Sequence, residues 1–388
     1  MPRLLTVLGL QCYALVLAWV RSLGGIRTDE AKYLLDIPYP HPPALRWVFS
    51  QAETWAAQDW FWRVVLASLT VQAAWLVWDL ARDQPRRRQI VIAGAWLLSG
   101  GVLLQAGSVM MVVATALQLL AFLWLRSRPE VAARNQGAVA LLWLFSLFTA
   151  YQALLFLPMA VSTFRRSGVS AGRTAFYVAV PVLLLALYTL TNPLVPASML
   201  AHAGRQIAET PFDRVLSSLR VWAIAGSGIA SVAGTWGLLR SRDLPALASF
   251  LLVAAYVVLS RYDYYAILFL PLLVSGLRSL SALPRPRMAL PSLALCSAVL
   301  VWLVPPPLSP GPARATAELL PNLTVGRTIA IHGSFGHEWQ HAYGGEVARY
   351  PAALDRAAAV VCLEACPEAA ASGAFLRVAA PVEAYVRR

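Results

Sequence analysis

Charged side chains are scarce in this chain, and lysine is nearly absent. Only 13% of its 388 residues are charged while 59% are hydrophobic, and Lys32 is the single lysine. This composition excludes an ordinary soluble domain, and the mean hydropathy of +0.60 is typical of a polytopic membrane protein. The net charge of +13 comes from arginines spread over many short loops. It therefore indicates membrane topology and surrounding lipids, and no nucleic-acid partner.

Cysteine is equally rare, with four in the chain. Cys12 and Cys296 fall within apolar stretches and are expected to behave as small apolar residues. Cys362 and Cys366 stand four positions apart near the end of the chain. A short-loop disulfide between them fits an oxidising compartment, although one built within a regular helix would be strained.

What the chain does have is a series of long apolar runs. Several are shorter than the ~20 residues that cross a bilayer, so tilt or snorkelling ends have to help. The first run is flanked by Arg3 and Arg21 and lacks a small-residue cleavage site, which predicts a retained span or signal anchor. The runs are residues 4–20, 61–80, 90–105, 108–125, 138–161, 175–190, 215–239, 244–260, 264–277 and 288–305.

Five groups of arginines separate these runs, and placing all five in the cytoplasm satisfies the positive-inside rule. The groups at Arg134 and Arg165 can share a side only if residues 138–161 enter the membrane and return, so we expect two short helices broken near residues 149–152. The outer side then holds residues 27–59, 104–108, 192–214, 261–263 and everything after 305. The groups are Arg82 with Arg86, Arg87 and Arg88; Arg126, Arg128 and Arg134; Arg165, Arg166 and Arg173; Arg240 and Arg242; and Arg278, Arg285 and Arg287.

The predicted fold is an all-α polytopic membrane protein with a small C-terminal domain. About 11 helical crossings, counting the short hairpin, put the N-terminus inside and the C-terminus outside. Residues 1–305 form the transmembrane domain. Residues 306–388 have a mixed composition with candidate strands at 325–332 and 358–363, which predicts a small α/β extracytoplasmic domain.

Polar chemistry gathers in residues 27–47, directly after the first run. Asp29 and Glu30 are adjacent, and His41 lies among prolines that favour an extended backbone. A proline-rich turn with solvated charges is the simple explanation of this loop. However, the outer loops collect carboxylates, histidines and tyrosines, while the inner loops carry mainly arginine. This asymmetry favours chemistry at the outer membrane–water boundary.

Two stretches resemble the GT-C glycosyltransferases, especially the bacterial protein-mannosyltransferase-like and lipid A aminoarabinose transferase-like enzymes. The first is Asp29-Glu30-x-x-Tyr33, followed by Tyr39-x-His41-Pro-Pro and by Trp62-Arg63 at the second run. The second runs from Arg261-Tyr-Asp-Tyr-Tyr265 to Leu270-Pro271-Leu272. Together they cover most of residues 1–280, and they are more specific for the superfamily than for a substrate.

The resemblance implies a GT-C fold and a glycosyltransferase of the bacterial inner membrane. Such an enzyme moves a sugar, with inversion, from a polyprenyl-phosphate donor to an acceptor hydroxyl of a protein, lipid or glycan at the outer face. Asp29 matches the family's catalytic base, with Glu30 beside it. In relatives the residue before Pro-Pro reaches the donor phosphate, so the resemblance places His41 there. Arg205 and Arg261 lie on other outer loops and are the candidate partners of that phosphate. Tyr33, Tyr39 and Tyr265 combine apolar rings with hydroxyl groups and are expected to line the sugar site. The simpler alternatives are a turn histidine at 41 and arginines that snorkel to lipid headgroups.

The chain also departs from the family pattern. Many relatives carry a second acidic residue where the fourth span opens, but residues 105–108 read Gln-Ala-Gly-Ser. Glu53, Asp59 or Asp213 would have to substitute. A family lysine near the fifth span is replaced by Tyr151-Gln152. A two-carboxylate or metal-assisted mechanism is therefore weakened: we expect no cofactor, and a divalent metal is not supported.

One further motif, His337-Glu-Trp-Gln-His341, fits H-E-x-x-H. A helix would place both histidines on one face for zinc, with Glu338 as base. The metzincin third ligand falls at Val347, and the glycines at 344 and 345 break the helix. An incidental match is therefore the preferred interpretation. A zinc protease and an incidental zinc or acceptor-contact site stay open.

The rival to an enzyme is a non-catalytic transporter or lipid-handling membrane protein. A secondary transporter is expected to show paired repeats and ionisable residues near the membrane midplane. The sequence shows no internal repeat, and its apolar runs are nearly free of charge. An interfacial enzyme is therefore the favoured interpretation.

Overall fold

The protein is represented by a computed structural model, which describes residues 2–37, 41–51, 58–195, 211–260, 262–304, 327–333, 336–343, 345–378 and 382–388. The chain forms two compact units. The first, called the helical unit, contains Met1–Ala18, Tyr39–Leu45 and Phe61–Pro306. The second, called the sheet unit, contains Trp19–Pro38, Arg46–Trp60 and Pro307–Arg388.

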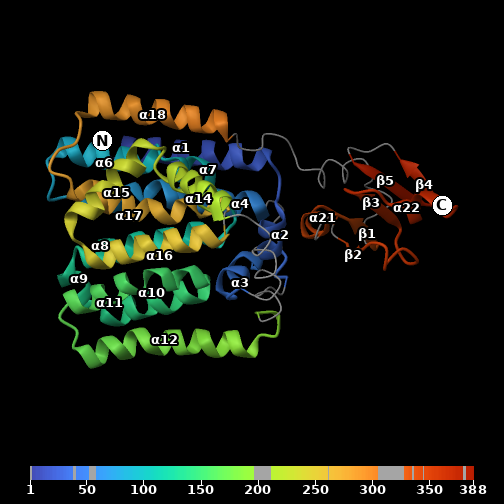
Figure 1. The fold of residues 1–388 in the computed structure, drawn as a ribbon, viewed down its shortest axis with the longest axis horizontal. Helices are drawn as coiled ribbons and strands as arrows, with labels where there is room; N and C mark the ends of the chain where they lie inside the picture. The colour runs from blue at the N-terminus through green and yellow to red at the C-terminus, as the bar shows by residue number, and fades with distance from the viewer. Residues whose placement is uncertain are drawn as a thin grey trace. The chain divides into compact units, whose positions relative to one another are not determined.

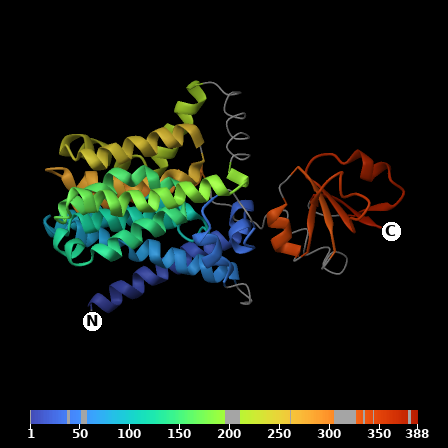
Figure 2. The same ribbon diagram turned by 90° about the horizontal axis from the view of Figure 1, so that it is seen from below.

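The helical unit is a bundle whose helices run side by side (Figures 1 and 2), with α12 and α18 at opposite edges in Figure 1. Apolar residues at helical spacing account for these elements, and basic or polar residues separate them. The described elements that lie wholly or for the most part in this unit are α1 (Pro2–Leu23), α4 (Gln58–Gln72), α5 (Ala74–Leu80), α6 (Arg86–Leu97), α7 (Gly100–Gln105), α8 (Met111–Arg126), α9 (Pro129–Arg134), α10 (Gln136–Thr149), η1 (Tyr151–Phe156), α11 (Leu157–Arg166), α12 (Ala171–Thr191), α14 (Pro211–Ala225), α15 (Ile229–Ser241), α16 (Leu244–Ser260), η2 (Asp263–Tyr265), α17 (Ala266–Ser279) and α18 (Pro286–Leu303).

Helix α17 is the centre of the bundle, because every residue from Ala266 to Leu277 is buried. Its closest neighbour is α15, and glycines let the two backbones touch. A Cβ atom added at Gly237 would lie 1.9 Å from the carbonyl oxygen of Gly276, and one added at Gly276 would lie 1.8 Å from that of Gly234. Small residues at this spacing are the usual means by which membrane helices approach closely.

The apolar run 138–161 is broken, as predicted from the arginine groups. Helix α10 ends at Thr149, and Ala150 adopts an extended conformation with φ −160° and ψ 143°. The short 3-10 helix η1 follows, and α11 then continues to Arg166. The predicted interruption near residues 149–152 is therefore confirmed, whereas its depth in the membrane stays a prediction.

The arginine groups meet at one end of the helical unit. Arg88, Arg126, Arg166 and Arg278, from four of the five groups, line one pocket together with Asp243, which follows the fifth group directly. The grouping of these loops agrees with the topology expected from the sequence, because charged loops on one side of a membrane must lie at one end of the bundle.

The chain is mostly helical, and the length of its apolar helices makes it a multi-pass membrane protein. Among the described residues, five helices are long and apolar enough to span a bilayer, and a sixth span results if the pair around Gly228, bent by 96°, counts as one. Three shorter apolar helices, α8, α10 and α16, fall below that length. The count of about 11 crossings stays a prediction.

The sheet unit contains five described strands in the order β2-β1-β3-β5-β4. β1 pairs in parallel with β2 and β3, whereas β5 is antiparallel to β3 and β4. The predicted strands at 325–332 and 358–363 correspond to β1 and β3. The described elements that lie wholly or for the most part in this unit are α2 (Thr28–Leu34), α3 (Ala44–Ser50), β1 (Ile329–His332), α21 (His337–Tyr343), β2 (Val347–Arg349), β3 (Ala359–Cys362), α22 (Pro367–Ala371), β4 (Phe375–Val378) and β5 (Glu383–Arg387).

The core of the sheet explains where α21 lies. Ile329, Ile331 and Val361 pack on one face of the sheet against Trp339, which is fully buried. Trp339 is the middle residue of the H-E-x-x-H match, so its indole fixes α21 to the sheet. Cys362 and Cys366 form a disulfide across the loop from β3 to α22. The short-loop disulfide considered from the sequence is therefore present, and no regular helix contains it.

Candidate functional site

Helix α2 carries the two adjacent carboxylates, and its own first turn explains why it forms here. The Glu30 carboxylate accepts a hydrogen bond at 3.0 Å from the backbone N–H of Arg27, which precedes the helix. This is the reciprocal half of a capping box and satisfies a donor that the helix leaves unpaired. Asp29 and Glu30 both lie in the first turn, where negative charge is favourable.

Asp29 is the partly exposed carboxylate of this pair. Its side chain is 38% exposed, and one oxygen lies 3.1 Å from the ammonium of Lys32 one turn later, whose side chain is only 9% exposed. The lysine, buried along its stem, therefore orients the Asp29 carboxylate while leaving it accessible to a reactant. The single lysine of the chain is thus next to the predicted base.

Glu30 has a different environment. Its side chain is fully buried, and its second oxygen lies 3.4 Å from the guanidinium of Arg21, which is also buried. Both oxygens therefore have partners that hold α2 against the end of the first helix. This geometry gives Glu30 an anchoring role, and the catalytic role expected for it from the sequence stays a prediction.

The H-E-x-x-H helix packs against α2. The Thr28 hydroxyl donates a hydrogen bond of 2.5 Å to the carboxylate of Glu338. Burial, followed by the positive charge of Lys32, lowers the pKa of His337, while Glu338 and Asp29 act in the opposite direction. His337 is therefore close enough to sense both members of the Asp29–Lys32 pair.

Tyr33, expected beside the sugar, is almost completely buried on α2. Its ring meets that of Phe49 edge-on, with centroids 6.2 Å apart. The ring therefore helps to pack α2 on α3. Asp36, just after α2, forms an ion pair of 2.6 Å with Arg46 on the same helix α3.

His41, expected at the donor phosphate, belongs to the helical unit. Its ring lies 6.0 Å from that of Tyr151 in η1, and its backbone carbonyl accepts a hydrogen bond of 3.1 Å from the Tyr188 hydroxyl. The same hydroxyl accepts a bond of 3.1 Å from the Asn192 amide. Aromatic and amide groups from η1 and from the end of α12 thus position the histidine backbone.

Tyr265 closes a buried polar cluster in the helical unit. Its hydroxyl accepts hydrogen bonds from Tyr256 at 2.8 Å and from the Gln152 amide at 3.2 Å. Gln152 thus brings a neutral amide to this cluster. Tyr265 is 4% exposed. Its contact with the sugar stays a prediction.

The remaining predicted residues, Tyr39, Arg205, Arg261 and Glu53, lie outside the described residues. Within the described ranges, no group of three or more histidine, cysteine or carboxylate side chains is placed to hold a metal ion. His337 and His341 stand one turn apart on α21, but their helix is committed to the sheet through Trp339 and to α2 through Glu338.

The site residues expected from the sequence do not include Lys32, Thr28, His337 or Glu338. Lys32 had one signal, its uniqueness in the chain. The H-E-x-x-H match was a visible signal for α21, but it pointed toward zinc. Its contact with α2 links residues 310 positions apart, and no local pattern reports such a contact.

No family model matches the sequence, and no curated protein matches it. A solved structure that resembles the chain is that of the Archaeoglobus fulgidus oligosaccharyltransferase in a complex with zinc and sulfate. The likeness has a TM-score of 0.47 and 12% identity, and it covers 91% of this chain and 67% of that one. A likeness at this level does not establish a common fold.

Proposed function

We propose that the chain is a membrane glycosyltransferase that moves a sugar from a polyprenyl-phosphate donor to an acceptor hydroxyl, with Asp29 as the general base. The observation that carries the proposal is the geometry of α2. A short helix directly after the first apolar helix presents one accessible carboxylate, held by the only lysine, while the neighbouring carboxylate is buried as an anchor. The motif Asp29-Glu30-x-x-Tyr33 and its resemblance to GT-C enzymes supply the reaction type.

The reaction requires one proton transfer and one displacement. The acceptor oxygen attacks the anomeric carbon of the sugar as the carboxylate of Asp29 takes the hydroxyl proton. The bond from that carbon to the phosphate oxygen breaks, and its electron pair leaves with the polyprenyl phosphate. Attack opposite the leaving group inverts the anomeric centre.

Lys32 and α21 act as positioning groups in this scheme. The Lys32 ammonium fixes the direction of the Asp29 carboxylate, and the Thr28–Glu338 hydrogen bond fixes α2 itself. A base held in one orientation loses less entropy when the reactants meet. Lys32 therefore contributes orientation, and its own proton is not consumed.

The leaving phosphate needs cationic donors, because negative charge develops on it as the bond breaks. His41, Arg205 and Arg261 are the groups that we assign to it. We place the site at the outer face of the bacterial inner membrane, since the loops that carry these residues are those the arginine distribution assigns to that side. Tyr33, Tyr39 and Tyr265 would shape the sugar site.

The test is direct transfer by the purified chain. Protein in detergent is incubated with a panel of polyprenyl-phosphate sugars and candidate acceptors, and the release of polyprenyl phosphate is measured. The proposal expects acceptor-dependent release with at least one donor. Binding of donors without release under any acceptor condition would instead favour the non-catalytic, lipid-handling alternative.

A further inference from the structure

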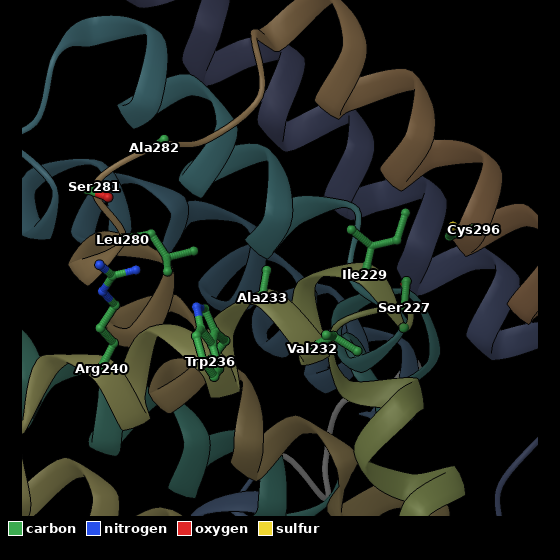
Figure 3. Close-up of a pocket in the computed structure, with 11 residues that line it drawn as sticks. Ser227, Ile229, Val232, Ala233, Trp236, Arg240, Leu280, Ser281, Ala282 and Cys296 are labelled. Atoms are coloured by element: carbon green, nitrogen blue, oxygen red, sulfur yellow. The ribbon is translucent and has the colours of Figure 1, made fainter.

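An apolar pocket of about 840 Å³ lies in the helical unit between α15 and α18. Val232 and Trp236 are among the exposed apolar side chains that line it. Arg240, in the last turn of α15, stands beside Leu280 at one end of the pocket (Figure 3). In the part of the chain that the structure describes, its guanidinium has neither a hydrogen bond nor an ion pair.

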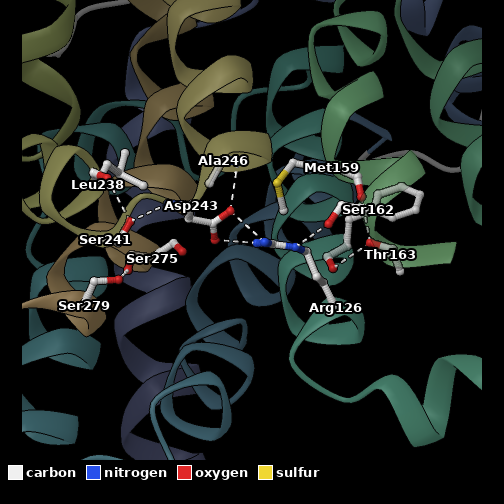
Figure 4. Close-up of polar contacts among 11 residues, drawn as sticks. Arg126, Met159, Ser162, Thr163, Leu238, Ser241, Asp243, Ala246, Ser275 and Ser279 are labelled. Atoms are coloured by element: carbon white, nitrogen blue, oxygen red, sulfur yellow. Dashed lines mark hydrogen bonds and ion pairs between the residues drawn. The ribbon is translucent and has the colours of Figure 1, made fainter. Parts of the chain in front are cut away.

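A second pocket of about 420 Å³ lies where the arginine groups meet, and it is strongly polar. Two of its arginines are already neutralised. The guanidinium of Arg126 donates two hydrogen bonds of 2.6 Å to Asp243 (Figure 4). That of Arg278 donates bonds of 3.1 and 2.9 Å to Asp83. These bidentate pairs are fixed parts of the pocket wall.

The other two arginines have no carboxylate partner among the described residues. Arg88 donates to neutral oxygens, the Gln84 side chain at 2.9 Å and the Leu280 carbonyl at 3.4 Å. Arg166 makes no hydrogen bond or ion pair in the described ranges. Burial and then the charge of Arg126 lower the pKa of Arg166, and the charge of the Asp243 carboxylate offsets only part of this effect. An anion in the pocket would relieve this unbalanced positive charge.

The two pockets adjoin, because Leu280 and Ser281 line both of them. A cationic cavity therefore continues past the loop between α17 and α18 into an apolar groove on the exposed side of α15. A small soluble anion would bind only in the cationic cavity. A molecule with an anionic head and a long apolar chain would place its head in the cationic cavity and its chain in the apolar groove.

We infer that this composite pocket binds one phospholipid with an anionic headgroup. Its phosphate lies among Arg88, Arg166 and Arg240, and an acyl chain lies along Val232 and Trp236. A zwitterionic lipid fits less well, because its ammonium would enter a region that already carries excess positive charge. The inference does not rest on the proposed glycosyl transfer, and its site belongs to the opposite set of loops.

The experiment is native mass spectrometry of the full chain, titrated in detergent with dioleoyl-phosphatidylglycerol or dioleoyl-phosphatidylcholine. We expect one retained molecule of the anionic lipid at concentrations where the zwitterionic one is lost. Arg166→Gln removes no described hydrogen bond, and it should weaken retention about fivefold, as should Arg88→Gln. The matched controls Arg173→Gln and Arg87→Gln, from the same two groups but outside the pocket, should leave it unchanged.

Two further arms identify the source of the anion. Ala233→Phe, which fills the apolar groove, should reduce lipid retention, whereas Leu183→Phe on the exposed side of α12 should not. Inorganic phosphate at millimolar concentration should raise the melting temperature less than the anionic lipid does. Equal retention of both lipids, no effect of the pocket arginines, or a full melting shift from phosphate alone would each overturn the inference.

Discussion

Replacing Asp29 by asparagine removes a proton acceptor and changes little else. The amide has the same shape, and its oxygen can still accept the hydrogen bond that Lys32 donates over 3.1 Å. Helix α2 should persist, because its capping contact and its buried anchor both involve Glu30. The variant therefore isolates the chemistry of one carboxylate.

The effect of losing the ion pair and the effect of losing the base differ in size. The Asp29 side chain is 38% exposed, so losing its ion pair costs at most about 1 kcal/mol, roughly a fivefold change in rate if all of it appears in the transition state. Loss of a general base costs ~10²–10⁴ in rate. Asp29→Asn should thus lower turnover far beyond what the broken ion pair explains, while donor binding changes little, because the carboxylate does not attract the donor phosphate.

The assay is the single-turnover release of polyprenyl phosphate with saturating donor, together with a separate measurement of donor affinity. Asp36→Asn is the matched control, since Asp36 is 49% exposed, lies in the same segment and also has a cationic partner, Arg46. Its rate should stay within about fivefold of wild type. An Asp29→Asn protein that retains more than about a tenth of the wild-type rate, or an Asp36→Asn protein equally impaired, would refute the assignment.

Three other results are expected. Gly237→Ala should destabilise the helical unit by at least 1–3 kcal/mol, about the cost of overpacking, because its new Cβ meets backbone atoms of α17; thermal unfolding in detergent measures this. Asp243→Asn should cost about 3 kcal/mol by leaving the buried Arg126 without its partner, and the loss should appear in the same melting assay. Burial and Lys32 lower the pKa of His337 below its unfolded value, so the contact of α21 with α2 is strongest above the ordinary histidine pKa and weakens as pH falls; amide exchange in residues 28–34 should quicken between about pH 7 and pH 5.

Each of these has a control. Gly172→Ala, at a helical glycine with open space around it, should be neutral or slightly stabilising. Burial raises the pKa of Asp243, but Arg126 outweighs it and lowers that pKa overall, so stability should fall as pH drops below the ordinary carboxyl range in wild type and not in Asp243→Asn. His337→Gln should remove most of the pH effect on exchange. Unchanged melting in Gly237→Ala, a cost-free Asp243→Asn, or pH-dependent exchange that persists in His337→Gln would contradict the respective argument.

Local patterns in the sequence were sufficient for several features. The break at Ala150 followed from the need to return Arg165 to the side of Arg134. The disulfide followed from the spacing of two cysteines in the stretch predicted to lie outside the membrane. The first constraint comes from the charges that flank one apolar run, and the second from two cysteines close in sequence. Both can therefore be recognised without knowing the tertiary structure.

Other features depend on contacts that sequence patterns do not contain. Nothing in the sequence near Glu30 shows that its carboxylate turns inward to Arg21, so Glu30 stayed a second catalytic candidate beside Asp29. The H-E-x-x-H match suggested a metal ligand set, whereas the structure uses Trp339 for the sheet and Glu338 for Thr28. The close approach of Gly237 and Gly276 likewise joins two helices whose pairing has no signature in either helix alone.

The hydrogen bond between Thr28 and Glu338 has a consequence for the order in which the protein is made. Helix α2 leaves the ribosome early, yet the helix that packs against it is synthesised 310 residues later. A nascent chain therefore inserts most of its apolar helices while α2 still lacks this support. A truncated chain that ends before β1 would still contain the apolar helices and Asp29. Its helix α2 would, however, lack the hydrogen bond from Thr28 to Glu338. Synthesis of α21 is thus the step that completes the surroundings of Asp29.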